Sequence, residues 1–361
     1  MKYYYILLME NKCNLNSITN KNEFNPNNIH YFCDISTNSY SDWCVDNTFI
    51  VFKSFNNILY LIYSTDDDSI ISYDLEKKQI INEIKNSHKE TINNFRHYFD
   101  KKNKRDLILS ISMKKNNIRV WNVNNFKCLA NILNINNNGF LCSASFLNNK
   151  EEIYIITSHI SFDTGISEPI KIFNFNGQKI NTIKNSKEPT YFIDIYYENK
   201  NNQQEIYIIS GNKGFIKSYN YKNNEIYYKY QDNNENNNVN FNINTYESIV
   251  INDNEKIIKL IGSNREGKIL VWNFHSGLIL NKIIIEYRCF NGISLWENDY
   301  LFAGCDDDTI KLIDLKSNKI VKSFEGHNKS VSTVKTTMHL QYGKCLLSQG
   351  DEDDQIKLWI I

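Results

Sequence analysis

The chain has 361 residues, and its 41 basic and 41 acidic side chains leave a formal net charge of zero at pH 7. A chain without net charge lacks the broad positive field that gathers nucleic acid or an anionic membrane surface, so we expect neither as a partner. Aromatic residues make up 13% of the chain and prolines number only 3, a composition that favours β-strands and argues against global disorder.

The cysteines and the N-terminal stretch bear on the compartment. The 8 cysteines are scattered and include no CxxC pair, so we expect free, mostly buried thiols rather than disulfides or a zinc site. The start, MKYYYILLMENK, has no small-residue cleavage site after its apolar run, and no run approaches the ~18 apolar residues of a membrane span. We therefore expect a cytoplasmic or nuclear protein, with a flexible extension at residues 1–27 before a single domain at 28–361.

One pattern repeats along the chain: a polar turn, alternating apolar positions, and an aromatic or Ile anchor that is usually followed by Asp or Asn. In chain order, the segments are STDDDSIISYDL from Ser64, SMKKNNIRVWNV from Ser112, SEPIKIFNF from Ser167, GNKGFIKSYNY from Gly211, SNREGKILVWNF from Ser263, GCDDDTIKLIDL from Gly304 and GDEDDQIKLWII from Gly350. Their anchors are Tyr73, Trp121, Phe173, Tyr219, Trp272, Ile313 and Trp359. The alternation has a period of two, which predicts strands rather than the helices of a solenoid.

The pattern resembles the WD-repeat family from about residue 29 onward. The last repeat carries the resemblance best, with Gly326-His327 followed by VSTVKTT and CLLSQGDEDDQIKLW. Four other repeats keep one letter of the WD dipeptide, at Tyr73-Asp74, Trp121-Asn122, Trp272-Asn273 and Ile313-Asp314. The resemblance implies an all-β, seven-bladed β-propeller, with four antiparallel strands in each blade around a central channel.

The last repeat stops two residues after Trp359, before the outer strand that the other repeats have. An outer edge without a partner would leave backbone groups open and invite aggregation. The segment NIHYFCDIS, residues 28–36, is a spare strand before the first repeat. We expect it to pair beside the last strand and close the ring.

Three acidic runs, at residues 66–68, 306–308 and 351–354, fall at the turn of the pattern. In the WD-repeat family, an Asp at this turn joins a hydrogen-bonded set with a strand Ser or Thr, a loop His and the Trp. Carried over, the complete set here is His327, Ser348, Asp353 and Trp359. The second repeat offers His88, Ser110 or Ser112, and Trp121, with Lys115 in place of the acid. Calcium binding is the alternative for the acidic runs, but the DxDxDG pattern that it requires is absent, so we favour the structural role.

No nucleophile elbow, P-loop or HExxH motif occurs, and we predict a non-catalytic protein without metal or cofactor. Faces of WD-repeat propellers hold peptides and subunits, so the resemblance implies a scaffold or adaptor for protein or peptide partners, monomeric within a larger complex. The residues next to the turn acids and the loop His are the candidates for a partner-binding face: Asp66, Lys114, Arg265, Asp306, Asn328, Lys329 and Glu352.

Two further expectations concern the partner. The acidic candidates fall in blades one, six and seven, and basic Lys114 and Arg265 flank them, which predicts a peptide with a central basic residue and acidic ends. The alternative function is a substrate-recruiting subunit of a ubiquitin ligase. Against it, the residues before the first strand are too few for an F-box-like region, and the W-D-x-R adaptor box is missing.

Overall fold

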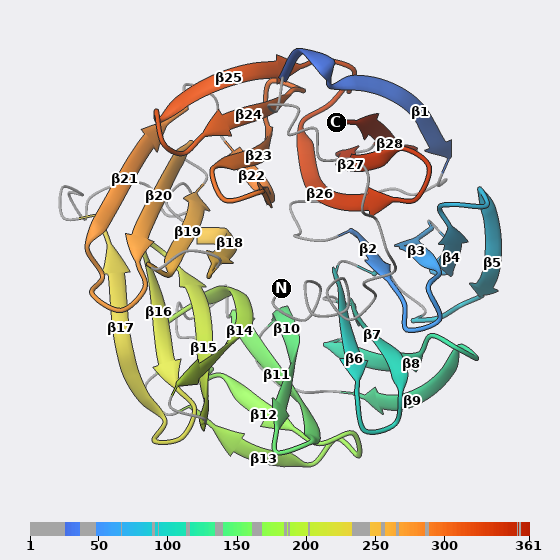
Figure 1. Ribbon diagram of the computed structural model, residues 1–361. Coiled ribbons are helices and arrows are strands. Elements are labelled where there is room, and N and C mark those ends of the chain that lie inside the picture. The colour runs from blue at the N-terminus through green and yellow to red at the C-terminus, as the bar shows by residue number, and fades with distance from the viewer. Residues whose placement is uncertain are drawn as a thin grey trace.

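The computed structural model of the protein describes residues 26–36, 48–65, 67–88, 91–92, 94–112, 116–133, 140–160, 168–183, 186, 188–200, 203–232, 246–253, 257–264, 267–285, 289–351, 353 and 355–361. Within these ranges, the chain forms seven four-stranded antiparallel sheets and one short 3-10 helix, η1 (Pro26–Asn28). Figure 1 shows the sheets as blades arranged in a ring, and in six of them the strand that comes first in the chain lies nearest the centre. The predicted all-β, seven-bladed β-propeller is confirmed.

In blades one to three, the strands follow one another along the chain from the centre outward. Blade one consists of β2 (Phe49–Lys53), β3 (Leu59–Ser64), β4 (Ile70–Asp74) and β5 (Gln79–Ile84). Blade two consists of β6 (Asn94–Asp100), β7 (Arg105–Ser112), β8 (Asn117–Asn122) and β9 (Lys127–Ile132). Blade three consists of β10 (Phe140–Asn149), β11 (Glu152–Ile160), β12 (Lys171–Phe173) and β13 (Lys179–Thr182).

Blades four to six repeat this order. Blade four consists of β14 (Thr190–Lys200), β15 (Gln203–Asn212), β16 (Phe215–Asn220) and β17 (Glu225–Gln231). Blade five consists of β18 (Tyr246–Asn252), β19 (Lys259–Asn264), β20 (Lys268–Asn273) and β21 (Ile279–Ile284). Blade six consists of β22 (Cys289–Trp296), β23 (Tyr300–Cys305), β24 (Ile310–Asp314) and β25 (Lys319–Phe324).

The core lies in the seams between blades, because each sheet packs both faces against its neighbours. The middle strands are therefore apolar on both faces, as in β20, whose residues 269–272 are all buried. The outermost strands meet solvent and carry more polar residues, as in β5, which has no fully buried residue. One core cluster joins the first and last blades, where Phe49 and Leu61 pack with Leu347. The described ranges contain no helix long and apolar enough to cross a membrane.

Blade seven is completed by the N-terminal strand. From the centre outward it consists of β26 (Val331–His339), β27 (Gly343–Gly350), β28 (Gln355–Ile360) and β1 (His30–Ser36). The outermost strand, β1, runs antiparallel to β28. The predicted closure by residues 28–36 is thus confirmed, with the strand itself beginning two residues later than the segment. Residues 1–25 of the predicted extension lie outside the described residues.

Side chains reinforce the pairing of β1 with β28. The Lys357 ammonium donates to the Asp34 carboxylate at 2.9 Å, and the Tyr31 ring packs edge-on against Trp359 with centroids 5.7 Å apart. Burial raises the pKa of Asp34, but hydrogen bonds from Lys357 and Tyr31 outweigh it, so the pKa lies below its usual value. Lys322 of β25 also donates to the carbonyl oxygens of Pro26 and Ile29, which ties the start of the strand to blade six.

Closure by β1 predicts the outcome of two N-terminal deletions. Removing residues 1–36 exposes the whole edge of β28 and the apolar side chains that β1 covers, each worth ~2 kcal/mol of burial, so the protein should become insoluble or strongly destabilised. Removing residues 1–20 keeps β1 and should be tolerated. Urea unfolding of both variants provides the measurement. Equal unfolding midpoints for the longer deletion and the full chain would show that β1 does not hold the ring.

Candidate functional site

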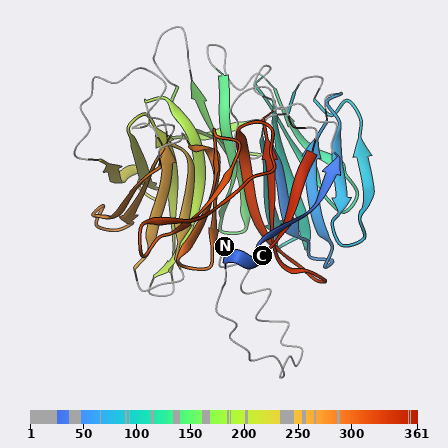
Figure 2. The same cartoon turned by 90° about the horizontal axis from the view of Figure 1, so that it is seen from above.

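The loops of the ring divide into two sets. Because successive strands of a blade are antiparallel, the turns between second and third strands lie at the same end of the ring as the links between blades. We call this end the linker face and the other end the opposite face; in the side view of Figure 2 the strands run between them. The candidates Asp306, Asn328 and Lys329 belong to the linker face. The remaining candidates, Asp66, Lys114, Arg265 and Glu352, lie outside the described residues.

Below the linker face of blade seven, four side chains from separate segments form one hydrogen-bonded set. His327 lies in the link between β25 and β26, and its Nδ1 lies 2.5 Å from Asp353 Oδ2 in the next turn. Its Nε2 lies 2.7 Å from Ser348 Oγ on β27. Trp359 of β28 donates from Nε1 to the same Ser348 oxygen at 2.8 Å. The set thus connects the link, the turn and the two middle strands of the blade, β27 and β28.

The protonation that satisfies every group of this set follows from the donors available. An ionised Asp353 can only accept, so His327 donates from Nδ1 and accepts at Nε2. Ser348 then donates to His327 while it accepts from Trp359. The same three residue types, Ser, His and Asp, form hydrolase triads, but here the Ser348 hydroxyl is 0% exposed and already engaged with Trp359. The set is therefore built to hold the blade together and offers no nucleophile to solvent.

Blade two has the same arrangement without the acid. His88 Nε2 lies 2.6 Å from Ser110 Oγ, and Trp121 Nε1 donates to that oxygen at 2.9 Å, so Ser110 rather than Ser112 occupies the strand position. His88 Nδ1 is buried and has no hydrogen-bond partner among the described residues. Burial and, secondarily, the charge of Arg119 lower the pKa of His88 to about 3. Lys115, at the position of the acid, lies outside the described residues.

On the surface above His327, two aspartates from neighbouring blades approach one hydroxyl. Ser330 Oγ lies 3.2 Å from Asp306 Oδ1 and 3.4 Å from Asp351 Oδ2. Asp306 belongs to the turn after β23 in blade six, and Asp351 to the turn after β27 in blade seven. The two acids therefore meet at one hydroxyl across the boundary between blades six and seven, and we call them the acidic pair. Asp351 was not among the predicted face residues, although it belongs to a predicted acidic run.

Two other turn acids, Asp307 and Asp67, accept hydrogen bonds from residues close in sequence. Asp307 accepts from the Thr309 hydroxyl at 2.6 Å and from Lys311 at 2.7 Å. Burial raises its pKa, but these bonds outweigh the burial and lower it overall. Asp67 accepts from the Thr65 hydroxyl in the same way. Across the described residues, no three His, Cys, Asp or Glu side chains are placed to hold a metal ion.

No protein-family model matches the sequence, and no curated protein matches it significantly. The chain is a seven-bladed β-propeller.

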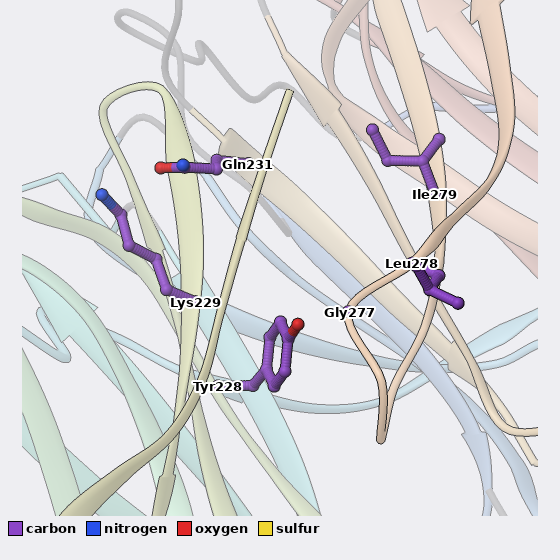
Figure 3. A pocket seen from close by; sticks show the side chains of 6 residues that line it. All are labelled: Tyr228, Lys229, Gln231, Gly277, Leu278 and Ile279. Carbon is purple, nitrogen blue, oxygen red and sulfur yellow. The ribbon is translucent and has the colours of Figure 1, made fainter. Parts of the chain in front are cut away.

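A hollow of about 310 Å³ opens on the rim of the propeller, between blades four and five (Figure 3). It is lined by Tyr228, Lys229 and Gln231 of β17 and by Gly277, Leu278 and Ile279 at the start of β21. Gly277 has a φ of 64°, and a Cβ there would overlap the Tyr228 ring, so both conformation and packing require glycine. The lining has no carboxylate or imidazole, and it combines the polar side chains of Tyr228, Lys229 and Gln231 with the apolar side chains of Leu278 and Ile279.

The hydrogen-bonded set of blade seven predicts a graded series of stability losses. Trp359→Ala removes a buried aromatic and should lower the free energy of unfolding by about 3–5 kcal/mol. Asp353→Ala leaves His327 Nδ1 without its acceptor and should cost less, about 1–3 kcal/mol. Trp359→Phe, which keeps most of the packing but loses the bond to Ser348, is the matched control. Urea unfolding measures all three, and an Asp353→Ala protein as stable as wild type would show that the bond contributes nothing.

Buried His88 and His159 predict an acid-sensitive fold. Burial lowers the pKa of both to about 3, with a smaller effect of Arg119 on His88 and of Lys171 on His159. Below the ordinary histidine pKa of ~6.5, both side chains are protonated in the unfolded chain but remain neutral in the folded protein. The free energy of unfolding therefore falls as the pH drops from ~6.5 towards ~3. The expected slope is about 1.4 kcal/mol per pH unit for each histidine, measured by urea unfolding at several pH values.

A single substitution should reduce this slope. Lys115→Asp places a carboxylate six residues before Trp121, as Asp353 stands before Trp359, and should give His88 Nδ1 an acceptor. The pKa of His88 should then rise, and the loss of stability in acid should shrink. Lys102→Asp, on the exposed hairpin tip between β6 and β7, makes the same charge change as a control. If both variants have the same pH dependence, the missing acid is not what keeps His88 neutral.

Proposed function

We propose that this protein is a non-catalytic scaffold or adaptor that binds a protein or peptide on its linker face. The acidic pair of Asp306 and Asp351 carries the proposal, because it brings two half-buried carboxylates from neighbouring blades to one hydroxyl of the linker face. Exposed Asn328 and Lys329 lie in the same link, beside Ser330. Amide, ammonium and carboxylate groups together suit a polar peptide with a basic residue at the acidic pair.

The scaffold beneath this surface supports a binding role. Ser330, at the centre of the acidic pair, is three residues from His327, which is held by Asp353 and Ser348. A surface fixed in this way loses little conformational entropy when a partner binds. The proposed partner-binding face extends to the other candidates, Asp66, Lys114, Arg265 and Glu352, which would give an acidic arc between basic flanks.

A peptide array tests the proposal. Wild-type protein should select peptides with a central Lys or Arg, and Asp306→Asn/Asp351→Asn should weaken their binding by about tenfold or more, since charge pairs of this kind set specificity. Binding should also weaken as salt rises. The matched control is Glu297→Gln/Asp299→Asn, which removes two carboxylates from a turn of the opposite face. If only the control variant loses its peptides, the opposite face is the binding surface.

Co-purification addresses the ubiquitin-ligase alternative. A substrate-recruiting subunit would bring cullin-type ligase subunits with it from cell extract, whereas a scaffold of another kind would not. The Asp306→Asn/Asp351→Asn variant should lose the peptide-type partner in the same experiment while it keeps any ligase subunits bound elsewhere on the propeller.

A further inference from the structure

Arg96 makes a contact that crosses the interior of the ring. It belongs to β6, the innermost strand of blade two, and its guanidinium lies over the ring of Phe192, 5.3 Å from the centroid. Phe192 belongs to β14, the innermost strand of blade four. Blade three stands between these two blades in the ring (Figure 1), so the contact joins the innermost strands of blades that are not neighbours.

This guanidinium has no oxygen partner in the described part of the chain. Its Nε–H and Nη2–H groups are shielded from solvent and donate to no acceptor there. The other arginines that the structure describes are both engaged: Arg105 with the Asp100 carboxylate at 2.8 Å, and Arg119 with Asn131 and the Ser87 carbonyl. A cation held away from water without a counter-charge is destabilising, and an aromatic face compensates only in part because it accepts none of the directed N–H groups.

Arg96 lies in the half of β6 that is nearer the linker face. Arg96 pairs with Leu109, close to the end of β7 at Ser112, which is the linker-face end of that strand. Phe192 likewise pairs with Gly211, next to the end of β15 at Asn212. Asp194, two residues further along β14, is exposed although it lies within an innermost strand, so solvent reaches the inner surface of the ring.

The chemistry of the site selects a carboxylate. A guanidinium presents a planar fork of N–H donors that matches a carboxylate in two parallel hydrogen bonds. Phe192 is buried in the core cluster with Tyr196 and Trp272, so its ring has a fixed position against which the Arg96 guanidinium packs. A single cation without an oxygen acceptor in the described residues suits a ligand with one negative charge better than a phosphate dianion.

We propose that Arg96, supported by Phe192, binds the side-chain carboxylate of an Asp or Glu residue that a peptide on the linker face inserts towards the ring axis. The inference rests on the proposed function, since the peptide is the one expected at the acidic pair. Its basic residue contacts Asp306 and Asp351, and one of its acidic residues reaches Arg96. Arg96 would therefore distinguish peptides that carry this acidic residue from peptides that lack it.

The test compares Arg96→Met, which removes the charge at similar volume, with Arg96→Lys, which keeps the charge but loses the fork. Fluorescence anisotropy with array-selected peptides, each made in Glu and Gln versions and with a C-terminal amide, reports binding. Wild type should prefer the Glu version by about tenfold, Arg96→Met should bind both versions equally, and Arg96→Lys should fall between them. Asp306→Asn/Asp351→Asn should weaken both versions in the same proportion.

Stability separates a binding role from a structural one. Without peptide, Arg96→Met should unfold at the same or a higher urea concentration than wild type, because it removes an unpaired, partly buried charge. A variant that is less stable and still prefers the Glu version would overturn the proposal and make Arg96 a structural residue.

A second experiment, with small molecules, tests the carboxylate site independently of the peptide. If wild type binds no peptide, the proposed function fails, but butyrate should still raise the melting temperature of wild type more than that of Arg96→Met, with butyramide as the uncharged control. A butyrate effect without peptide binding would assign the site to free carboxylates and would contradict the proposal that the carboxylate comes from a peptide. No peptide preference and no butyrate effect together would overturn the carboxylate site altogether.

Discussion

The pairing of β1 with β28 is the constraint on which the rest of the propeller depends. A blade with only β26, β27 and β28 would expose the backbone edge of its third strand, and the ring would have a seam without a covalent or hydrogen-bonded connection across it. The Asp34–Lys357 ion pair and the Tyr31–Trp359 contact bring the ends of the chain together at this blade. A ring closed in this way has no free start or end at which unfolding of single blades can begin.

Closure also supports the linker face of the same blade. Tyr31 packs on Trp359, and Trp359 donates to Ser348, which contacts His327. His327 fixes the link that carries Ser330 between the acidic side chains of Asp306 and Asp351. A chain of direct contacts therefore runs from the N-terminal strand to the surface that we propose as the partner-binding face. Blade two shows that the ring tolerates an incomplete set, because His88 remains buried and neutral there.

Charge is distributed differently on the surface and in the interior of this protein. The turn acids Asp67 and Asp307 are satisfied within their own turns, so their charges are largely committed to local structure. The acidic pair is shared between two blades and lies at the surface. Arg96 differs from these acids, because it is a single cation on an innermost strand. Its guanidinium stacks on Phe192 and has no oxygen acceptor in the described residues. A protein without net charge can therefore still discriminate between peptides by the order of their charged residues.

The sequence by itself determined the number of blades, the strands and the closing segment. These follow from local patterns: alternation with a period of two around anchors such as Trp121 and Trp272, and a spare strand opposite a missing one. The sequence also indicated the His327–Ser348–Asp353–Trp359 arrangement, because each residue has a fixed place in the repeat. Only the tertiary structure decided that Asp306 and Asp351 meet at Ser330, and that Arg96 reaches Phe192 across a whole blade. The reason is physical: a repeat pattern specifies contacts within a blade and with its neighbours, whereas contacts across the ring depend on its curvature and closure, which no single segment encodes.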